Sequence, residues 1–310
     1  MSGRVTVLTG GVGGAKLVLG LLQVMPAREI TAIVNTGDDF RHLGLHISPD
    51  IDTLLYTLSG KANRAQGWGR EGESWNFMDA LRSLGGEDWF ALGDGDMALH
   101  VLRTLAMARG QTLTDITRAF AAAWNIDATI LPMTDQSVAT CLSTDEGELE
   151  FQRYFVERQC APRVDRIDFR GAVDADPAPG VIDAILGAET VLIAPSNPYL
   201  SIDPILSVAP IRRALEEIDA PVIAVSPIVG GKAVKGPTAK LMAELGVPVD
   251  NAAIAAHYHG VIDGLLIDTT DAPPSGAFHV GRTDTLMSTL DDKMRVADAA
   301  LNLARSMART

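Results

Sequence analysis

The stretch VTVLTGGVGGAKL, residues 5–17, decides the fold of this chain: an apolar run leads into four glycines and then a lysine. It predicts a strand over 5–9, a tight turn, and a helix over 15–23. Glycines let the backbone approach a ligand closely, and free N–H groups at a helix start favour an anion. The turn therefore predicts phosphate binding, although glycines used only for packing would give the same pattern.

The turn matches neither of two common nucleotide-binding motifs. A P-loop has Ser or Thr after its lysine, where this chain has Leu17. A dinucleotide fingerprint has a third glycine where this chain has Lys16, and an acidic residue ends the second strand, where this chain has Asn35. We therefore expect phosphate chemistry and not hydride transfer to a nicotinamide.

The amino-acid composition argues against two classes of binding partner. The chain has 310 residues, 47% of them hydrophobic, and a formal net charge of −13. An acidic protein suits neither nucleic acid nor an anionic membrane, because both require a cationic surface. Cys141 and Cys160 form no metal or disulfide pattern, and no apolar run reaches the roughly 20 residues of a membrane span. We expect a cytoplasmic protein.

The alternation of apolar strands with amphipathic stretches predicts an α/β fold, a Rossmann-like, mostly parallel sheet with helices on both faces. We expect one domain over 1–310, with a mostly helical insertion at about 60–125, where all four tryptophans lie. Residues 137–170 alternate between apolar and polar and predict strands or a hairpin. Further expected strands are 30–35, 190–194, 222–225 and 265–268, and further expected helices are 96–108, 113–123, 206–218 and 291–307.

Polar loops follow three of these strands, where ligands gather in parallel sheets. They read NTGDD (35–39), PSNP (195–198) and SPIVGGK (226–232). The third loop contains a second glycine and lysine segment. Its lysines suit contact with phosphate or carboxylate, but an ordinary solvated loop has the same composition.

Two acidic pairs are expected at the same edge of the sheet. Asp38 and Asp39 end the first of these loops, and Asp50 and Asp52 lie in the segment SPDIDT (48–53). Together they form an oxygen-rich cluster suited to magnesium, which takes one or two carboxylates together with phosphate oxygens. Asp50 and Asp52 also fit the first turn of a helix, where acids merely complement the helix dipole.

In order along nearly the whole chain, these segments resemble the 2-phospho-L-lactate transferase family (CofD/FbiA) of coenzyme F(420) biosynthesis. The resemblance implies transfer of a phosphorylated three-carbon acid (lactyl, enolpyruvyl or glyceryl) from a guanosine diphosphate-type donor. The acceptor is the terminal ribityl hydroxyl of the deazaflavin Fo, GMP is released, and magnesium and a homodimer are implied. The matching segments are 10–17, 35–39, 48–53, 131–136, 195–198 and 226–232.

Carried over by motif, the resemblance also implies roles for single residues. Asp39, Asp50 and Asp52 are expected to bind magnesium, with Asp50 and Asp52 as the catalytic pair. Asp50, Asp94 and Asp96 are expected to contact Fo. The guanosine nucleotide and its phosphates are expected at Gly11, Gly13, Gly14, Lys16, Ser196, Asn197, Gly230, Gly231 and Lys232.

One position departs from the family pattern. The family typically has an arginine between the two acids of its Gly-Asp-x-Asp turn, a position linked to Fo binding, and this chain has Gly95. The alternative function is a nucleotide-sugar-binding regulator of the gluconeogenesis-factor type, which shares the glycine turn. Those relatives tend to carry a Gly-Ser-Leu-Tyr type of loop where this chain has PSNP (195–198), which favours the transferase.

Overall fold

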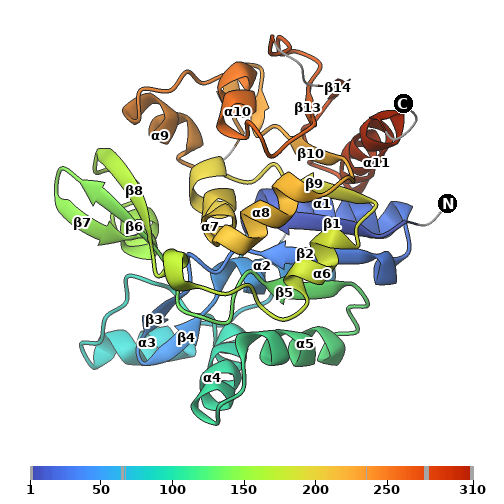
Figure 1. Cartoon of the computed structure of the whole chain (residues 1–310). Helices are drawn as coiled ribbons and strands as arrows, with labels where there is room; N and C mark the ends of the chain where they lie inside the picture. Colours follow the sequence, from blue (N-terminus) through green and yellow to red (C-terminus); the bar gives the residue numbers. More distant parts are fainter. Residues whose placement is uncertain (1–2, 64–65, 67, 235, 276–278, 308–310) are drawn as a thin grey trace.

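A seven-stranded sheet forms the centre of the chain in a computed structural model that describes residues 3–63, 66, 68–234, 236–275 and 279–307 (Figure 1). Its neighbouring strands all run parallel, in the order β14-β13-β10-β9-β1-β2-β5. The strands are β1 (Val5–Thr9), β2 (Ile30–Val34), β5 (Thr129–Pro132), β9 (Thr190–Ile193), β10 (Val222–Val225), β13 (Gly264–Asp268) and β14 (His279–Thr283).

The strand order positions the site. The central strand β1 pairs with β2 on one side, where Val7 lies opposite Ala32, and with β9 on the other, where Val7 lies opposite Leu192. After β1, the chain first adds β2 and β5 on one side of the sheet, and only later adds β9 on the other side of β1. In folds of this kind, ligands bind at the carboxyl ends of the strands where the order reverses, which here are β1 and β9.

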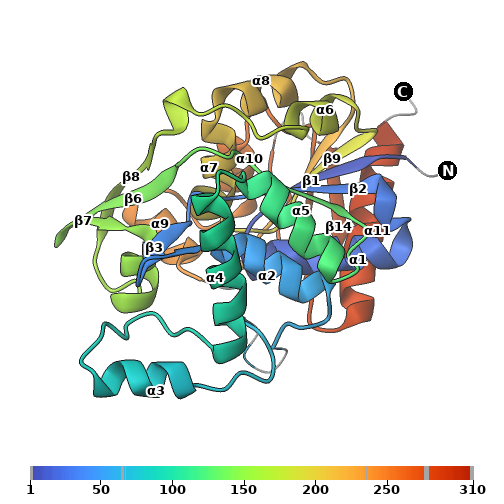
Figure 2. The ribbon, with the colours of Figure 1, turned by 90° about the horizontal axis from the view of Figure 1, so that it is seen from below.

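Helices cover both faces of the sheet, which confirms the predicted fold class (Figures 1 and 2). Each face has its own buried apolar cluster. One face packs against α1 (Gly11–Val24), α2 (Pro49–Leu58), α5 (Leu113–Ala123) and α11 (Leu290–Met307), and the other against α6 (Val181–Leu186), α8 (Ala209–Glu217), α9 (Thr238–Glu244) and α10 (Asn251–His257).

The segment predicted as a helical insertion contains three helices and, among its described residues, no strand of the central sheet. They are α3 (Asn76–Ser83), α4 (Asp94–Ala108) and α5. Figure 2 shows α3 and α4 extending away from the sheet. By contrast, α5 packs against the sheet beside β5, because its apolar face, with Leu113 and Ala121, joins the buried cluster.

Residues 137–170 form an antiparallel sheet in the order β7-β6-β8, as their alternation predicts. The alternation does not continue as a strand beyond Glu150, because the chain turns helical at Arg153–Glu157 (η2). There Phe151 stacks on Phe155 with 5.3 Å between ring centroids, which is the i,i+4 contact of a helix. The strands are β6 (Ala139–Thr144), β7 (Gly147–Glu150) and β8 (Val164–Arg170).

The predicted helix 206–218 is two helices. α7 (Asp203–Ser207) ends before Val208, and α8 begins at Ala209 with Pro210 in its first turn. Proline is accommodated at a helix start but not in the interior, which explains the break. None of the helices in the described part of the chain combines the length and the apolar content needed to span a membrane.

Candidate functional site

The glycine turn and the PSNP loop are in contact at the carboxyl ends of β1 and β9. The Ser196 hydroxyl donates a 2.6 Å hydrogen bond to the carbonyl oxygen of Gly10. A Cβ atom on Gly13 would lie 2.7 Å from the backbone oxygen of Pro195, so only glycine allows α1 to begin this close to the loop. The structure thus brings together two of the segments predicted to hold a nucleotide.

The start of α1 is occupied by an acidic side chain. The helix begins at Gly11, with φ at +62°, a region that favours glycine. The backbone N–H of Gly11 donates to Asp50 Oδ1 at 2.6 Å, and Asn35 Nδ2 donates to Asp50 Oδ2 at 2.9 Å. Asp50 therefore lies at the glycine turn, where the topology of the sheet predicts it.

Three carboxylates crowd this edge of the sheet. Burial raises the pKa of Asp50 to about 6, although hydrogen bonds from Asn35 and Gly11 lower it. Burial, and then the charge of Asp50, hold the pKa of Asp38 well above its usual range. Asp39 adds further negative charge to both. The groups around these three carboxylates do not compensate all of their negative charge.

Asp39 keeps one oxygen for a ligand. Its Oδ2 accepts a 2.7 Å hydrogen bond from the Ser48 hydroxyl and lies 3.1 Å from His46 Nε2. Its Oδ1 is buried and has no hydrogen-bond partner among the described residues. A buried carboxylate oxygen without a partner is costly unless something binds it. Asp39 Oδ1 is therefore suited to a cation such as magnesium, and magnesium binding by Asp39 and Asp50 stays a prediction.

Asp52 faces a different partner. The Arg103 guanidinium pairs with both of its carboxylate oxygens, and His100 Nδ1 lies 3.7 Å away. Arg103 is fully buried. The charge of Asp52 still contributes to raising the pKa of Asp38, so Asp52 lies near the other acids. The described residues contain no group of three or more His, Cys, Asp or Glu able to hold a metal ion, and this applies to all four aspartates. The metal and catalytic roles of Asp52 stay predictions.

Asp94 and Asp96 begin α4 and have separate surroundings. Asp94 accepts hydrogen bonds from the Ser74 hydroxyl at 2.6 Å and from the backbone N–H of Phe77 at 2.9 Å, which lower its pKa to about 2. It thereby caps α3. The Asp96 carboxylate accepts a hydrogen bond from the Tyr56 hydroxyl and lies 3.0 Å from His100 Nε2. Contact of either acid with Fo stays a prediction.

The second glycine loop also holds a carboxylate. Asp271 accepts from the backbone N–H of Gly230 at 3.2 Å and of Gly231 at 2.6 Å, while Lys232 is exposed. These are the amides that the sequence assigns to phosphate. Sequence reasoning missed Asp271, because it follows a different strand 40 residues further along the chain.

Lys16 and Asn197, both predicted to contact the nucleotide, differ in the hydrogen bonds that their side chains already make. Lys16 Nζ donates to the backbone oxygen of Met287 at 2.7 Å, so its ammonium group is engaged away from the glycines. Asn197 accepts from the backbone N–H of Tyr199 at 3.0 Å, but its Nδ2 is buried without a hydrogen-bond partner among the described residues. Asn197 thus keeps a donor, and the nucleotide contacts of both residues stay predictions.

A pocket of about 530 Å³ opens beside the acidic cluster. That volume suits a ligand of several rings. Its size could not be predicted from the sequence, because its walls come from several separate elements, among them the loop after β2, the loop after β5, β6, and the segments around His46 and Phe151. Its lining includes Thr36, Asp38, Asp39, His46, Gln136 and Phe151.

Residues 5–303 match the family described as "2-phospho-L-lactate transferase CofD". The chain is 41% identical to a phosphoenolpyruvate transferase of Streptomyces coelicolor, with 98% of this chain and 99% of that protein covered. It is 37% identical to a 2-phospho-L-lactate transferase of Methanosarcina mazei, with 94% and 97% covered. Protein BH3568 of Bacillus halodurans has a similar fold, with a TM-score of 0.64 at 18% identity over 97% of this chain and 100% of that one.

Proposed function

The chain belongs to the CofD family of 2-phospho-L-lactate transferases, and we propose that it transfers a phosphorylated three-carbon acid from a guanosine diphosphate-type donor to the deazaflavin Fo. GMP is the second product, and the reaction serves coenzyme F(420) biosynthesis. Relatives that are 40 and 41% identical are named phosphoenolpyruvate transferases, so we expect the enolpyruvyl donor to be used best. The enzyme acts in the cytoplasm as a homodimer.

One observation supports the proposal: the carboxylates of Asp38, Asp39 and Asp50 lie between the glycine turn and a large pocket. Asp50 accepts from the glycine turn, which also contacts Ser196. Asp38 and Asp39 line the pocket of about 530 Å³. The donor diphosphate suits the glycine turn, and the flat acceptor suits the pocket. The reacting phosphorus and the acceptor hydroxyl then meet at the carboxylates.

Magnesium is part of the proposal. Asp39 and Asp50 would hold the ion, because Asp39 has a buried oxygen without a partner among the described residues and burial keeps the Asp50 carboxylate away from water. When bound, it supplies positive charge that neutralises the diphosphate and the charge that develops during transfer.

Asp50 is the proposed base. The acceptor alcohol oxygen attacks the phosphorus that bears the three-carbon acid, and the bond from that phosphorus to the oxygen of GMP breaks. Asp50 accepts the proton of the alcohol. Its pKa of about 6 suits this role, because a base works best when its pKa lies near the working pH. Asn35 and Gly11 fix the carboxylate in place through one hydrogen bond to each oxygen.

Incubation with Fo, magnesium and each guanylylated three-carbon acid in turn tests the proposal. GMP and the Fo phosphodiester, measured by mass spectrometry, should form together and only when donor and Fo are both present. Absence of product with the enolpyruvyl, lactyl and glyceryl donors would reject the transferase. Tight binding of a UDP-sugar without any response to Fo would instead support the regulator.

A further inference from the structure

Two buried threonines lie at the inner end of the large pocket. Thr36 is in the loop that follows β2, and Thr140 is in β6. They are only 3% and 1% exposed, yet both line the pocket of about 530 Å³. They therefore lie deep in it, as does Asp38, which also lines the pocket and is 3% exposed.

Thr140 is fixed against Gly37, the residue that follows Thr36. Its backbone N–H donates to the carbonyl oxygen of Gly37 at 2.7 Å. A Cβ atom on Gly37 would lie 2.8 Å from Thr140 Oγ1, so a larger residue at position 37 would displace the hydroxyl group. The two threonines are therefore neighbours in space, although they are far apart in the sequence.

The hydroxyl groups of Thr36 and Thr140 are both buried, and neither has a hydrogen-bond partner in the described part of the chain. A buried hydroxyl group that makes no hydrogen bond costs roughly 1–3 kcal/mol. Two such groups beside each other at the wall of a pocket indicate that a ligand supplies the missing partner. Since Asp38 and Asp39 already provide acceptor oxygens there, the two hydroxyl groups contribute hydrogen-bond donors.

Arg41 provides positive charge in the same pocket. It is the only lysine or arginine among the described residues that line it. Its Nη1 donates a long hydrogen bond of 3.5 Å to the backbone oxygen of Gly44, and no ion pair of its guanidinium group is found within the described ranges. A negatively charged ligand group in this pocket would therefore find a cation that no carboxylate has already neutralised.

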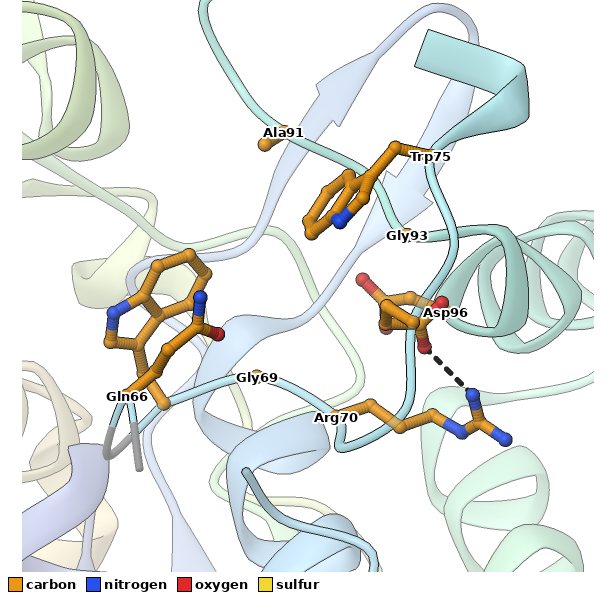
Figure 3. A pocket seen from close by; sticks show the side chains of 9 residues that line it. Gln66, Gly69, Arg70, Trp75, Ala91, Gly93 and Asp96 are labelled. Atoms are coloured by element: carbon orange, nitrogen blue, oxygen red, sulfur yellow. Dashed lines mark hydrogen bonds and ion pairs between the residues drawn. The ribbon is translucent and has the colours of Figure 1, made fainter. Parts of the chain in front are cut away.

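The other pocket that contains an arginine cannot hold an organic acid. Figure 3 shows Arg70 and Asp96 at this second pocket, beside the start of α4. Its volume is about 30 Å³, about the volume that one water molecule takes up in the liquid. Arg70 Nη1 also donates already to Glu73 Oε1 at 2.9 Å. Of these two pockets, only the larger one can accept such a ligand.

We propose that Thr36 and Thr140 bind the carboxylate of the transferred three-carbon acid and that Arg41 neutralises its charge, an inference that rests on the proposed function. The acid is bonded to the reacting phosphorus, which the proposed reaction places beside the acidic cluster at this end of the pocket. Enolpyruvyl, lactyl and glyceryl acids all have this carboxylate. The two threonines thus recognise the class of acid without distinguishing its members.

A donor that lacks the carboxylate tests the assignment. The donor that the wild type uses best is compared with an analogue that has a methyl group in place of the carboxylate. Thr36→Val and Thr140→Val should each lower kcat/KM for the natural donor about ten-fold, the loss expected for one hydrogen bond to a charged group. Both should leave kcat/KM for the methyl analogue within about two-fold of the wild type. Arg41→Gln should act selectively in the same direction.

Thr117→Val is the matched control. Thr117 is 1% exposed, and its hydroxyl group also has no hydrogen-bond partner among the residues that the structure describes. It lies in α5, outside the described lining of the pocket, so the substitution should change neither donor. The thermal unfolding midpoint of all three valine variants should not fall, because each loses a buried hydroxyl group that makes no hydrogen bond.

Calorimetric titration of each donor without Fo measures the same contact in the absence of turnover. The threonine variants of the pocket should bind the natural donor about ten-fold more weakly and the methyl analogue unchanged. Equal losses with the two donors would overturn the assignment, as would folded variants that bind the natural donor as tightly as the wild type does. If the binding difference is found but the wild type releases no GMP, the proposed function alone is contradicted.

Discussion

The carboxylate of Asp50 accepts a 2.6 Å hydrogen bond from the backbone N–H of Gly11. The chain thereby places its own anion on the first amide of the turn predicted to bind phosphate. Asp271 does the same at the other glycine loop, where it accepts from Gly230 and Gly231. A bound diphosphate must therefore share these amides with carboxylates or displace them, which makes a cation at the site advantageous.

The raised pKa of Asp50 predicts a pH-dependent reaction. Its carboxyl group is half ionised near pH 6, and only the ionised form can accept a proton or bind magnesium. At limiting magnesium, kcat/KM should therefore rise with pH up to about 6 and level off above it, with up to a tenfold change per pH unit on the acidic side, and saturating magnesium should shift this limb to lower pH because it binds the ionised form. Asp50→Asn should lower kcat/KM by on the order of a hundred-fold and remove this limb of the profile.

Asp292→Asn is the control for that profile. Asp292 also accepts a backbone N–H bond at a helix start, from Thr289 at 2.7 Å, but it lies in α11. The substitution should leave the acidic limb in place. A limb that persists in a folded Asp50→Asn variant would assign the ionisation to another group.

Gly13→Ala should disturb the contact between the glycine turn and the PSNP loop. The new methyl group would lie 2.7 Å from the backbone oxygen of Pro195, which cannot move without shifting the loop after β9. We expect a loss of about 1–3 kcal/mol in unfolding free energy, as for other overpacked sites, together with weaker donor binding. Urea unfolding and donor titration measure the two effects. Val12→Ala, in the same turn, should change both much less.

The central strands could be predicted closely from the sequence. The run VIAV at 222–225 is fully buried in a parallel sheet, and such strands read as uninterrupted apolar runs with clear ends. The start of α1 could not be predicted from the sequence, because Gly11, Gly13 and Gly14 have low helix propensity and such a run is typical of a loop. Gly13 allows the helix to start here because it packs closely against the backbone oxygen of Pro195, which is 182 residues further along the chain.

The site was predictable in part for a similar reason. In a parallel sheet, loops that follow neighbouring strands meet at one edge, so the proximity of Asp50 to the glycine turn follows from topology. The partner of Asp52 did not follow, because Arg103 lies 51 residues away on α4. The orientation of that helix is decided by tertiary packing, which local sequence patterns do not encode.

Removal of magnesium should abolish transfer while changing the unfolding midpoint little. Without a cation, the donor diphosphate meets the negative charges of Asp38, Asp39 and Asp50, and repulsion opposes its approach. Chelation with EDTA should lower the rate by on the order of a hundred-fold or more, and magnesium should restore it. A rate that is unchanged after exhaustive chelation would exclude the ion from the reaction. The unfolding midpoint, measured on the same samples, shows whether chelation acts on the fold instead.

The pair of Asp52 and Arg103 provides a test of whether Asp52 binds the metal. Removal of one partner leaves a buried charge unpaired, so Arg103→Met should cost roughly 3–5 kcal/mol of unfolding free energy in urea. Replacement of both by apolar residues, Asp52→Leu with Arg103→Met, should recover most of that loss, because no charge is then left unpaired. We expect the folded double variant to keep kcat/KM within about ten-fold of the wild type. If it is stable but as inactive as Asp50→Asn, Asp52 acts in the reaction in addition to its role in the fold.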